Sequence, residues 1–212
     1  MTNHSQKLYW TADSPFSRIV LWALAESGSL GGMNLVHLNW KELHSDRSAE
    51  ILSEERTVPF LISGDLRTAD SLRILAVLFP DTFTQWLTEA DGALYRCAEG
   101  QLGRIMYALY DGSTNEKTRG LWQSALASMS LLTAHADRTQ KQTGVSWGQI
   151  AAHTFVHFCL HFRAEWKQDL SADTLRALAL LERSASFHQL RTLAESHSCR
   201  VPCGGFSDSI SF

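Results

Sequence analysis

The sequence has little that would place the chain in a membrane or on a polyanion. Its first residues, MTNHSQK, have no apolar signal core, and no run approaches the roughly 18 apolar residues that a membrane-spanning helix needs. The formal net charge is only −3 over 212 residues, so no basic surface for nucleic acid or an anionic membrane is indicated. We therefore expect a cytoplasmic protein with neither nucleic acid nor membrane among its partners.

Cysteine is scarce, and its scarcity excludes several kinds of site. The four cysteines include no CxxC pair, so neither a disulfide framework nor a zinc ribbon is predicted. Ser14 and Ser17 stand at CxxC spacing but carry hydroxyls, which excludes disulfide exchange by the protein itself. The sequence also has no GxSxG elbow, which makes a serine hydrolase a poor hypothesis.

Residues 7–28 predict a short strand, a polar turn and an amphipathic helix. The strand covers Lys7 to Trp10, and Ser14 followed by Pro15 is typical of a helix N-cap and first helical position. Unpaired N–H groups and the helix dipole at that N-terminus favour an anion, such as a thiolate. The alternating residues that follow Met33 predict a second strand, parallel to the first, in a β-α-β unit.

Residues 57–68 predict a β-hairpin around a Gly-Asp turn. Pro59 stands where the first strand of this hairpin begins, and the peptide bond before it is compatible with either the cis or the trans isomer. The preceding residues 40–56 are charged and weakly patterned, and they predict at most a short helix around residues 48–53.

A carboxylate and a hydroxyl, those of Asp70 and Ser71, precede a helix predicted over residues 72–79. Such side chains either cap the helix or hold a ligand together with the free N–H groups beside them, and the residues alone leave both possibilities open. Pro80 ends this helix, and the strand signals disappear from Phe83 onward.

The rest of the sequence predicts an all-helical second domain. Apolar residues at helical spacing mark its helices, which we expect over residues 83–110, 117–141, 146–166, 171–182 and 185–195. The third of these has a capping box, with Ser146 as the N-cap and Gln149 three residues later. The tail over residues 199–212 matches no regular pattern.

His153, His157 and His161 recur every four residues on one predicted helix, which is a spacing of metal ligands. Apolar residues fall on the opposite face of that helix, so we expect the histidines to face solvent or an interface. No carboxylate motif accompanies them. Hydrogen bonding at the surface or between helices is therefore the favoured interpretation, and no metal is expected.

The order of these elements resembles the glutathione transferase superfamily over nearly the whole chain. The motifs that carry the resemblance are Ser14-Pro15-Phe16-Ser17, Thr57-Val58-Pro59, Asp70-Ser71 and the capping box of Ser146 and Gln149. The resemblance implies an α/β plus all-α fold, with an N-terminal thioredoxin-like domain over residues 1–80 and a C-terminal α-helical bundle domain over residues 84–212. It also implies a homodimer.

The same resemblance implies glutathione as co-substrate and Ser14 as the catalytic residue. The hydroxyl of Ser14 would donate a hydrogen bond to the glutathione sulfur and lower the pKa of the thiol. Val58 matches the residue whose backbone pairs with the cysteinyl part of glutathione, and Pro59 matches the cis-proline of the family. Asp70 and Ser71 match the pair that holds the γ-glutamyl end.

Four further residues have less specific expected roles. Phe16 is expected near the site, and Arg56 partly offsets two carboxylates that precede it where the family often has a basic residue. Arg104 and Tyr107 stand on the predicted helix that borders the electrophile pocket in this family. They serve either a second substrate or packing.

The function implied by the resemblance is that of a detoxifying transferase. Glutathione, activated as a thiolate, attacks a small hydrophobic electrophile. The alternative is a protein that keeps the same fold for binding or regulation, without turnover.

Overall fold

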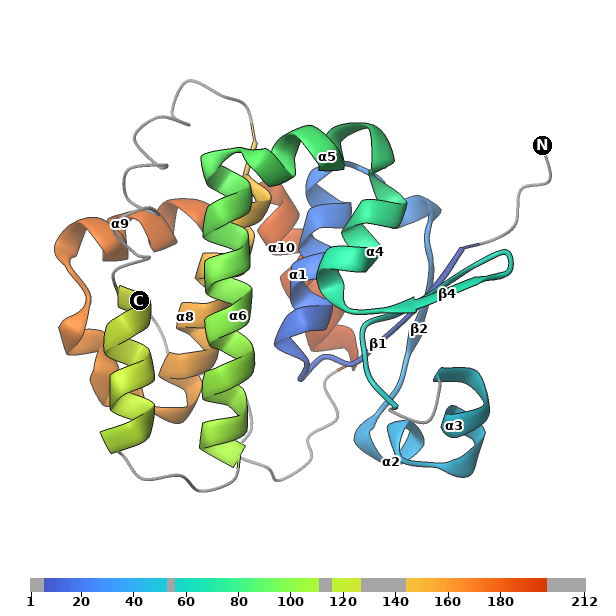
Figure 1. The fold of residues 1–212 in the computed structure, drawn as a ribbon, viewed down its shortest axis with the longest axis horizontal. Helices are drawn as coiled ribbons and strands as arrows, with labels where there is room; N and C mark the ends of the chain where they lie inside the picture. Colours follow the sequence, from blue (N-terminus) through green and yellow to red (C-terminus); the bar gives the residue numbers. More distant parts are fainter. Residues whose placement is uncertain (1–5, 53–55, 111–115, 127–143, 198–212) are drawn as a thin grey trace. The chain divides into compact units, whose positions relative to one another are not determined.

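The computed structural model describes residues 6–52, 56–110, 116–126 and 144–197 (Figure 1). These residues fall into two compact units. The first runs to Thr84 and takes up the chain again at Ser186, and the second covers Gln85–Ala185. The sequence predicts domains over residues 1–80 and 84–212. The structure differs from that division in that the described residues from Ser186 on belong to the first unit.

The first unit is built on a four-stranded sheet with the order β2-β1-β3-β4. The strands are β1 (Lys7–Trp10), β2 (Asn34–His37), β3 (Phe60–Ser63) and β4 (Leu66–Ala69). Strand β1 pairs in parallel with β2 and antiparallel with β3, and β3 pairs antiparallel with β4. The predicted parallel pair and hairpin are therefore confirmed, and the sheet has the expected thioredoxin-like arrangement.

The helices of the first unit include two that the sequence analysis did not predict. They are α1 (Pro15–Glu26), the 3-10 helix η1 (Leu30–Gly32), α2 (Trp40–Leu43), α3 (Asp46–Leu52), α4 (Ser71–Leu78) and, from its second residue on, α10 (Ala185–His197). The unpredicted helices are η1 and α2, and α2 has a clear local signal. The signal of α2 is a capping box, because the Asn39 side chain accepts from the Glu42 backbone at 3.0 Å and the Glu42 carboxylate accepts from the Asn39 backbone at 2.8 Å.

Helix α10 belongs to the first unit because its start is bound to α1. The Trp22 indole Nε1 donates to Ser186 Oγ at 2.9 Å, and the Trp22 ring lies 5.0 Å from the ring of Phe187. Ser186 Oγ in turn donates to the carboxylate of Glu26. These partners lie about 160 residues apart in the sequence, so no local pattern predicts the contact.

The second unit is helical throughout its described part, as predicted. Its helices are α5 (Pro80–Thr88), which crosses from the first unit, α6 (Ala90–Tyr110), residues 116–126, α8 (Trp147–Phe162), the 3-10 helix η2 (Ala164–Asp169) and α9 (Ala172–Leu181). The single helix predicted over residues 83–110 is divided at Glu89. The predictions for residues 127–141 and for the tail over residues 199–212 lie outside the described residues. In the described ranges, no helix is both long enough and apolar enough to cross a membrane.

Helix α8 lies at the centre of the second unit. It packs along α6 and contacts η2 and α9 (Figure 1). From Gly148 to Leu160, every residue except His157 is buried. Cys159 is among them, with no exposed surface, and its burial raises the pKa of the thiol well above its usual range.

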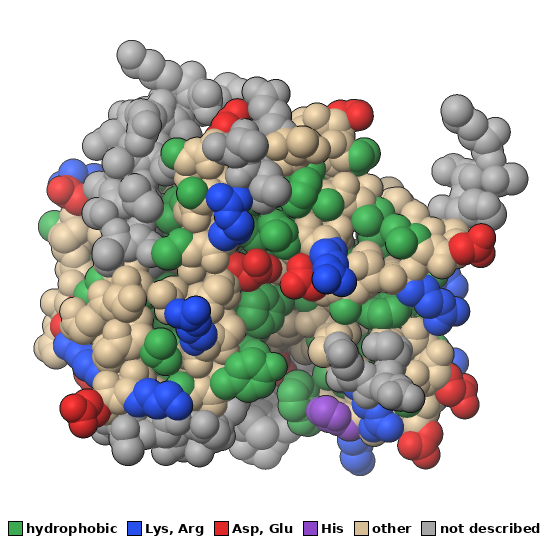
Figure 2. Space-filling model, in the orientation of Figure 1, with side chains coloured by type: hydrophobic (Ala, Val, Ile, Leu, Met, Phe, Trp, Pro, Cys, Tyr) green, Lys and Arg blue, Asp and Glu red, His purple; other side chains and the backbone are tan. Residues whose placement is uncertain are grey.

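Charged side chains of both signs are interspersed on the molecular face shown in Figure 2. No extended stripe of Lys and Arg stands out among the described residues on that face. This distribution agrees with the small formal net charge of −3.

His37 packs between two other aromatic rings of the first unit, and its titration makes the stability of that unit depend on pH. The ring of His37 lies 4.8 Å from that of Trp10 and 4.9 Å from that of His197. Burial, together with the charge on His197, lowers the pKa of His37 below 6.5, while Glu42 and Asp13 act in the opposite direction.

We expect the free energy of unfolding to fall as the pH drops below about 6.5, the ordinary pKa of His37. The unfolded chain takes up this proton first, because the folded state binds it more weakly, so acidification favours unfolding. Urea unfolding of the wild type and His37→Gln, compared at about pH 7.5 and about pH 5.5, measures the effect. The variant should lose less stability on acidification than the wild type, and equal losses would contradict the assignment.

Candidate functional site

Ser14 stands where the turn after β1 passes into α1. Its Oγ accepts a hydrogen bond from the Ser17 backbone N–H at 3.2 Å, and Pro15 occupies the first helical position, so the predicted N-cap is confirmed. The same Oγ donates to the carbonyl oxygen of Val58 at 3.3 Å. A hydroxyl that accepts from one group while it donates to another is polarised and becomes a stronger donor.

The turn that carries Ser14 is fixed by Arg18. Its Nε donates to the carbonyl oxygen of Ala12 at 3.1 Å. Burial lowers the pKa of Arg18 to about 10, although the charge of Asp13 acts in the opposite direction. At neutral pH the guanidinium therefore stays charged and holds the turn. The sequence analysis did not single out Arg18, although a cation among the apolar residues of the first helical turns was a usable signal.

Val58 and Pro59 lie directly before strand β3. The peptide bond between them is cis, the isomer that the family resemblance implies. Val58 is half-buried, and its carbonyl oxygen is the acceptor for Ser14. Two predicted motifs that lie 44 residues apart in the sequence thus meet in the structure.

Asp70 and Ser71 open helix α4, which packs on α1 in the same unit. Asp70 caps the helix, because its Oδ1 accepts from the backbone N–H of Arg73 at 3.1 Å. The Asp70 side chain is exposed, and its backbone has a positive φ of 78°, which is uncommon outside glycine. Ser71 is buried, with 1% of its surface exposed. The cap is thus observed, and the carboxylate still faces solvent.

Arg56 and Phe16 contribute less to this site. The guanidinium of Arg56 donates to the carbonyl oxygen of His44 at 2.6 Å and lies 3.8 Å from the carboxylate of Asp46. Arg56 therefore holds the segment between α2 and α3, and its role toward glutathione stays a prediction. Phe16 is half-buried in the first turn of α1, beside Ser14.

Arg104 and Tyr107 lie on α6 in the second unit. Both side chains are exposed, and that of Tyr107 has 71% of its surface accessible. Their exposure leaves them available to a ligand, and their proposed contact with a second substrate stays a prediction.

Two of the histidines of α8 face an interface with the end of α9, so the predicted hydrogen bonding between helices is confirmed. His153 is buried, with 2% of its surface exposed, on a helix that packs against α6, η2 and α9. The Nε2 atoms of His153 and His157 lie 3.1 and 2.7 Å from Oε1 of Glu182. Burial would raise the pKa of Glu182, but the hydrogen bonds from the two histidines outweigh it and lower the pKa to about 2.

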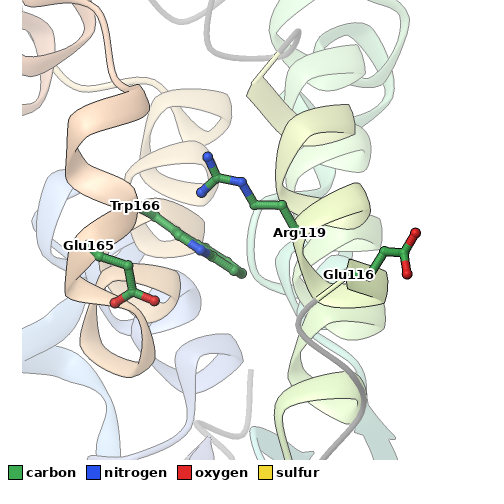
Figure 3. Close-up of a pocket in the computed structure, with 4 residues that line it drawn as sticks. All are labelled: Glu116, Arg119, Glu165 and Trp166. Carbon is green, nitrogen blue, oxygen red and sulfur yellow. The ribbon is translucent and has the colours of Figure 1, made fainter.

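A cavity of about 310 Å³ in the second unit is lined by Glu116, Arg119, Glu165 and Trp166 (Figure 3). Arg119 reaches from its helix toward Trp166 on η2, and its carbon Cζ lies 5.9 Å from the centre of that ring. The guanidinium is paired with the carboxylate of Asp169 at 2.7 Å. None of the predicted site residues lines this cavity, and the positive charge of Arg119 is already neutralised by Asp169.

Comparisons with known proteins bear on the fold. The sequence matches no protein-family model and no curated protein. Among solved structures, a glutathione transferase family member from Pseudomonas fluorescens Pf-5 with bound glutathione is similar, with a TM-score of 0.67 at 16% identity over 88% of this chain and 98% of that chain.

A glutathione S-transferase from Methylobacillus flagellatus with glutathione bound has a TM-score of 0.66 at 18% identity, over 88% of this chain and 98% of that chain. The glutathione transferase Omega 3C from Trametes versicolor has a TM-score of 0.63 at 16% identity, over 89% of this chain and 88% of that chain. At identities this low, the similarity shows the fold of the chain alone. These structural similarities, together with the sheet, the cis-proline and the helical second unit, show that this chain has the glutathione transferase fold.

Proposed function

We propose that the protein binds glutathione at the N-terminus of α1 and activates its thiol as a thiolate, which attacks a hydrophobic electrophile. The observation that carries the proposal is the position of Ser14. Its hydroxyl caps α1, accepts from Ser17 and reaches the carbonyl of Val58 directly before the cis-proline. Similar structures that hold glutathione support the choice of ligand.

Val58 would receive the cysteinyl part of glutathione through its backbone. The thiol would then arrive beside Ser14, whose hydroxyl turns from the Val58 carbonyl to the sulfur and still accepts from Ser17. A donor of this kind, together with the N-terminal dipole of α1, stabilises the anion and lowers the pKa of the thiol. The thiol proton passes to solvent.

Asp70 and Ser71 would hold the other end of the tripeptide. One carboxylate oxygen of Asp70 caps α4, and the exposed carboxylate is placed to bind the γ-glutamyl ammonium group. The Ser71 hydroxyl and the first N–H groups of α4 would bind the γ-glutamyl carboxylate. The reactive thiol is thereby fixed at two points of the first unit.

The reaction itself is a nucleophilic attack by sulfur. A carbon–sulfur bond forms, and the leaving group departs from the electrophile with the electron pair of the broken bond. Arg104 and Tyr107 on α6 are the residues that we assign to the second substrate. The proposal includes the homodimeric state that the family resemblance implies, and the cytoplasmic location expected from the sequence.

We expect the purified protein to bind glutathione at millimolar concentration or below, and to conjugate it to an aromatic electrophile such as 1-chloro-2,4-dinitrobenzene. Calorimetric titration measures the binding, and absorbance of the thioether measures the turnover. Asp70→Asn should weaken the binding, because the variant loses the charge that pairs with the ammonium group. A chain that binds no glutathione at millimolar concentration overturns the proposal. Binding without turnover supports the alternative of a binding or regulatory protein.

A further inference from the structure

His153, His157 and Glu182 bring three metal-binding side chains together in the second unit. The histidines stand one turn apart on α8, and Glu182 follows the last residue of α9 as its C-cap. The two imidazole rings lie nearly parallel, with centroids 4.5 Å apart and 19° between their planes. Both Nε2 atoms are directed at the same carboxylate oxygen, at 3.1 and 2.7 Å.

These distances are close to those around a bound zinc ion. Zinc lies about 2.0 to 2.2 Å from histidine nitrogen and carboxylate oxygen, so neighbouring ligand atoms of a tetrahedral site are roughly 3.3 Å apart. One ligand atom from each of the three residues lies within 4.8 Å of the others. To admit the ion, the carboxylate would have to withdraw from the histidines by a few tenths of an ångström. The two histidine nitrogens, up to 4.8 Å apart, would also have to turn toward each other until they are less than about 4.2 Å apart.

Two of the three side chains are partly exposed, so an ion can reach the site from solvent. The His153 side chain is 3% exposed, while those of His157 and Glu182 are 24% and 18% exposed. One ligand is thus anchored inside the unit, and two reach the surface. An ion held by these three groups keeps a coordination position for water, as in zinc sites with two histidines and one glutamate.

We propose that His153, His157 and Glu182 form a binding site for a divalent transition-metal ion, with zinc as the favoured occupant. The donor set suits this ion, since imidazole nitrogen and carboxylate oxygen are both zinc ligands. The bound ion would join the middle of α8 to the end of α9. This proposal goes beyond the glutathione chemistry of the first unit, and it departs from the expectation that the chain holds no metal.

The first test titrates zinc into the full-length, untagged protein after treatment with a chelator and dialysis. We expect one zinc ion per chain by calorimetry and by elemental analysis. His157→Gln and Glu182→Gln should each weaken binding by roughly 100-fold or more, because changes to groups behind the ligands already cost 10-fold to 100-fold. His161→Gln is the matched control, since it changes a histidine one turn further along α8 that is not part of the cluster.

A second measurement uses the wild-type protein and so does not depend on the folding of a variant. Cobalt added to the wild type should give the intense visible absorption of a four- or five-coordinate ion. The control His161→Gln should retain this absorption. Thermal unfolding in the presence of chelator identifies any variant that is damaged for other reasons. The proposal is overturned if the wild type binds no stoichiometric zinc and gives no such cobalt spectrum. It is also overturned if His161→Gln loses as much affinity as His157→Gln, which would place the ion on the surface of α8.

Discussion

Gly148→Ala is expected to lower the free energy of unfolding by about 3 kcal/mol, which is the upper range for overpacking a tight site. A Cβ atom at position 148 would lie 2.4 Å from Oδ1 and 2.6 Å from the backbone oxygen of Asp91. The expected sign opposes helix propensity, because alanine is the better helix former by about 0.8 to 1 kcal/mol.

Asp91 cannot move aside to admit the methyl group. Its carboxylate accepts hydrogen bonds from Trp86 Nε1 at 2.6 Å, from Ser146 Oγ at 2.5 Å and from the Gly148 backbone N–H at 3.0 Å. The closest backbone atom belongs to the first turn of α6, which packs along α8. A substitution must therefore either separate the two helices or break the hydrogen bonds that begin α8.

Urea unfolding of Gly148→Ala measures the loss, and Gly100→Ala is its matched control. Gly100 also lies within a helix, but a Cβ atom there would meet nothing within 4 Å. The control should stabilise the protein by about 0.5 to 1 kcal/mol through helix propensity alone. If both variants shift the midpoint in the same direction, the tight contact with Asp91 does not control the stability of α8.

Ser14→Ala is expected to lower the turnover of glutathione conjugation on the order of 100-fold, the usual loss when one donor to a developing anion is removed. Glutathione affinity should change far less, because Val58, Asp70 and Ser71 provide the proposed contacts to the rest of the tripeptide. A comparison of kcat with the glutathione dissociation constant separates the two effects. This prediction rests on the proposed function.

The substitution also removes a helix cap, so the control must remove a cap of the same kind. Ser171 caps α9 in the same way, since its Oγ accepts from the backbone of Thr174 at 3.1 Å. Ser171→Ala is therefore the control, and both Ser14→Ala and Ser171→Ala should lose about 1 kcal/mol of stability. Only Ser14→Ala should lose turnover. Equal losses of turnover and affinity in Ser14→Ala would mean that the hydroxyl serves only as a cap.

The sequence allowed prediction of those parts of the molecule that local patterns determine. The strand over Lys7–Trp10, the cap at Ser14 and the capping box at Ser146 depend on neighbours within a few residues, and the structure confirms all three. The cap of α2 at Asn39 is equally local and was overlooked. Its helix is only four residues long, too short to show a periodic apolar face.

Contacts between distant residues could not be predicted in this way. Glu182 completes a cluster with His153 from 29 positions away, and Asp91 binds Ser146 from 55 positions away. The prediction that the histidines face solvent or an interface could not name their partner, because the apolar period of a helix does not show which distant residue lies opposite. In α8 every residue from Gly148 to Leu160 except His157 is buried, so the apolar period also does not indicate which side chains are exposed.

The deep burial of Cys159 protects this thiol from the electrophiles that we propose the protein handles. Electrophiles alkylate thiolates, and the Cys159 thiol is both out of their reach and held protonated by its surroundings. A protein that presents an activated glutathione sulfur to such compounds thus keeps its own buried sulfur from competing for them. Alkylation at Cys159 becomes possible only when the second unit opens, so damage of this kind would fall on chains that have already lost their fold.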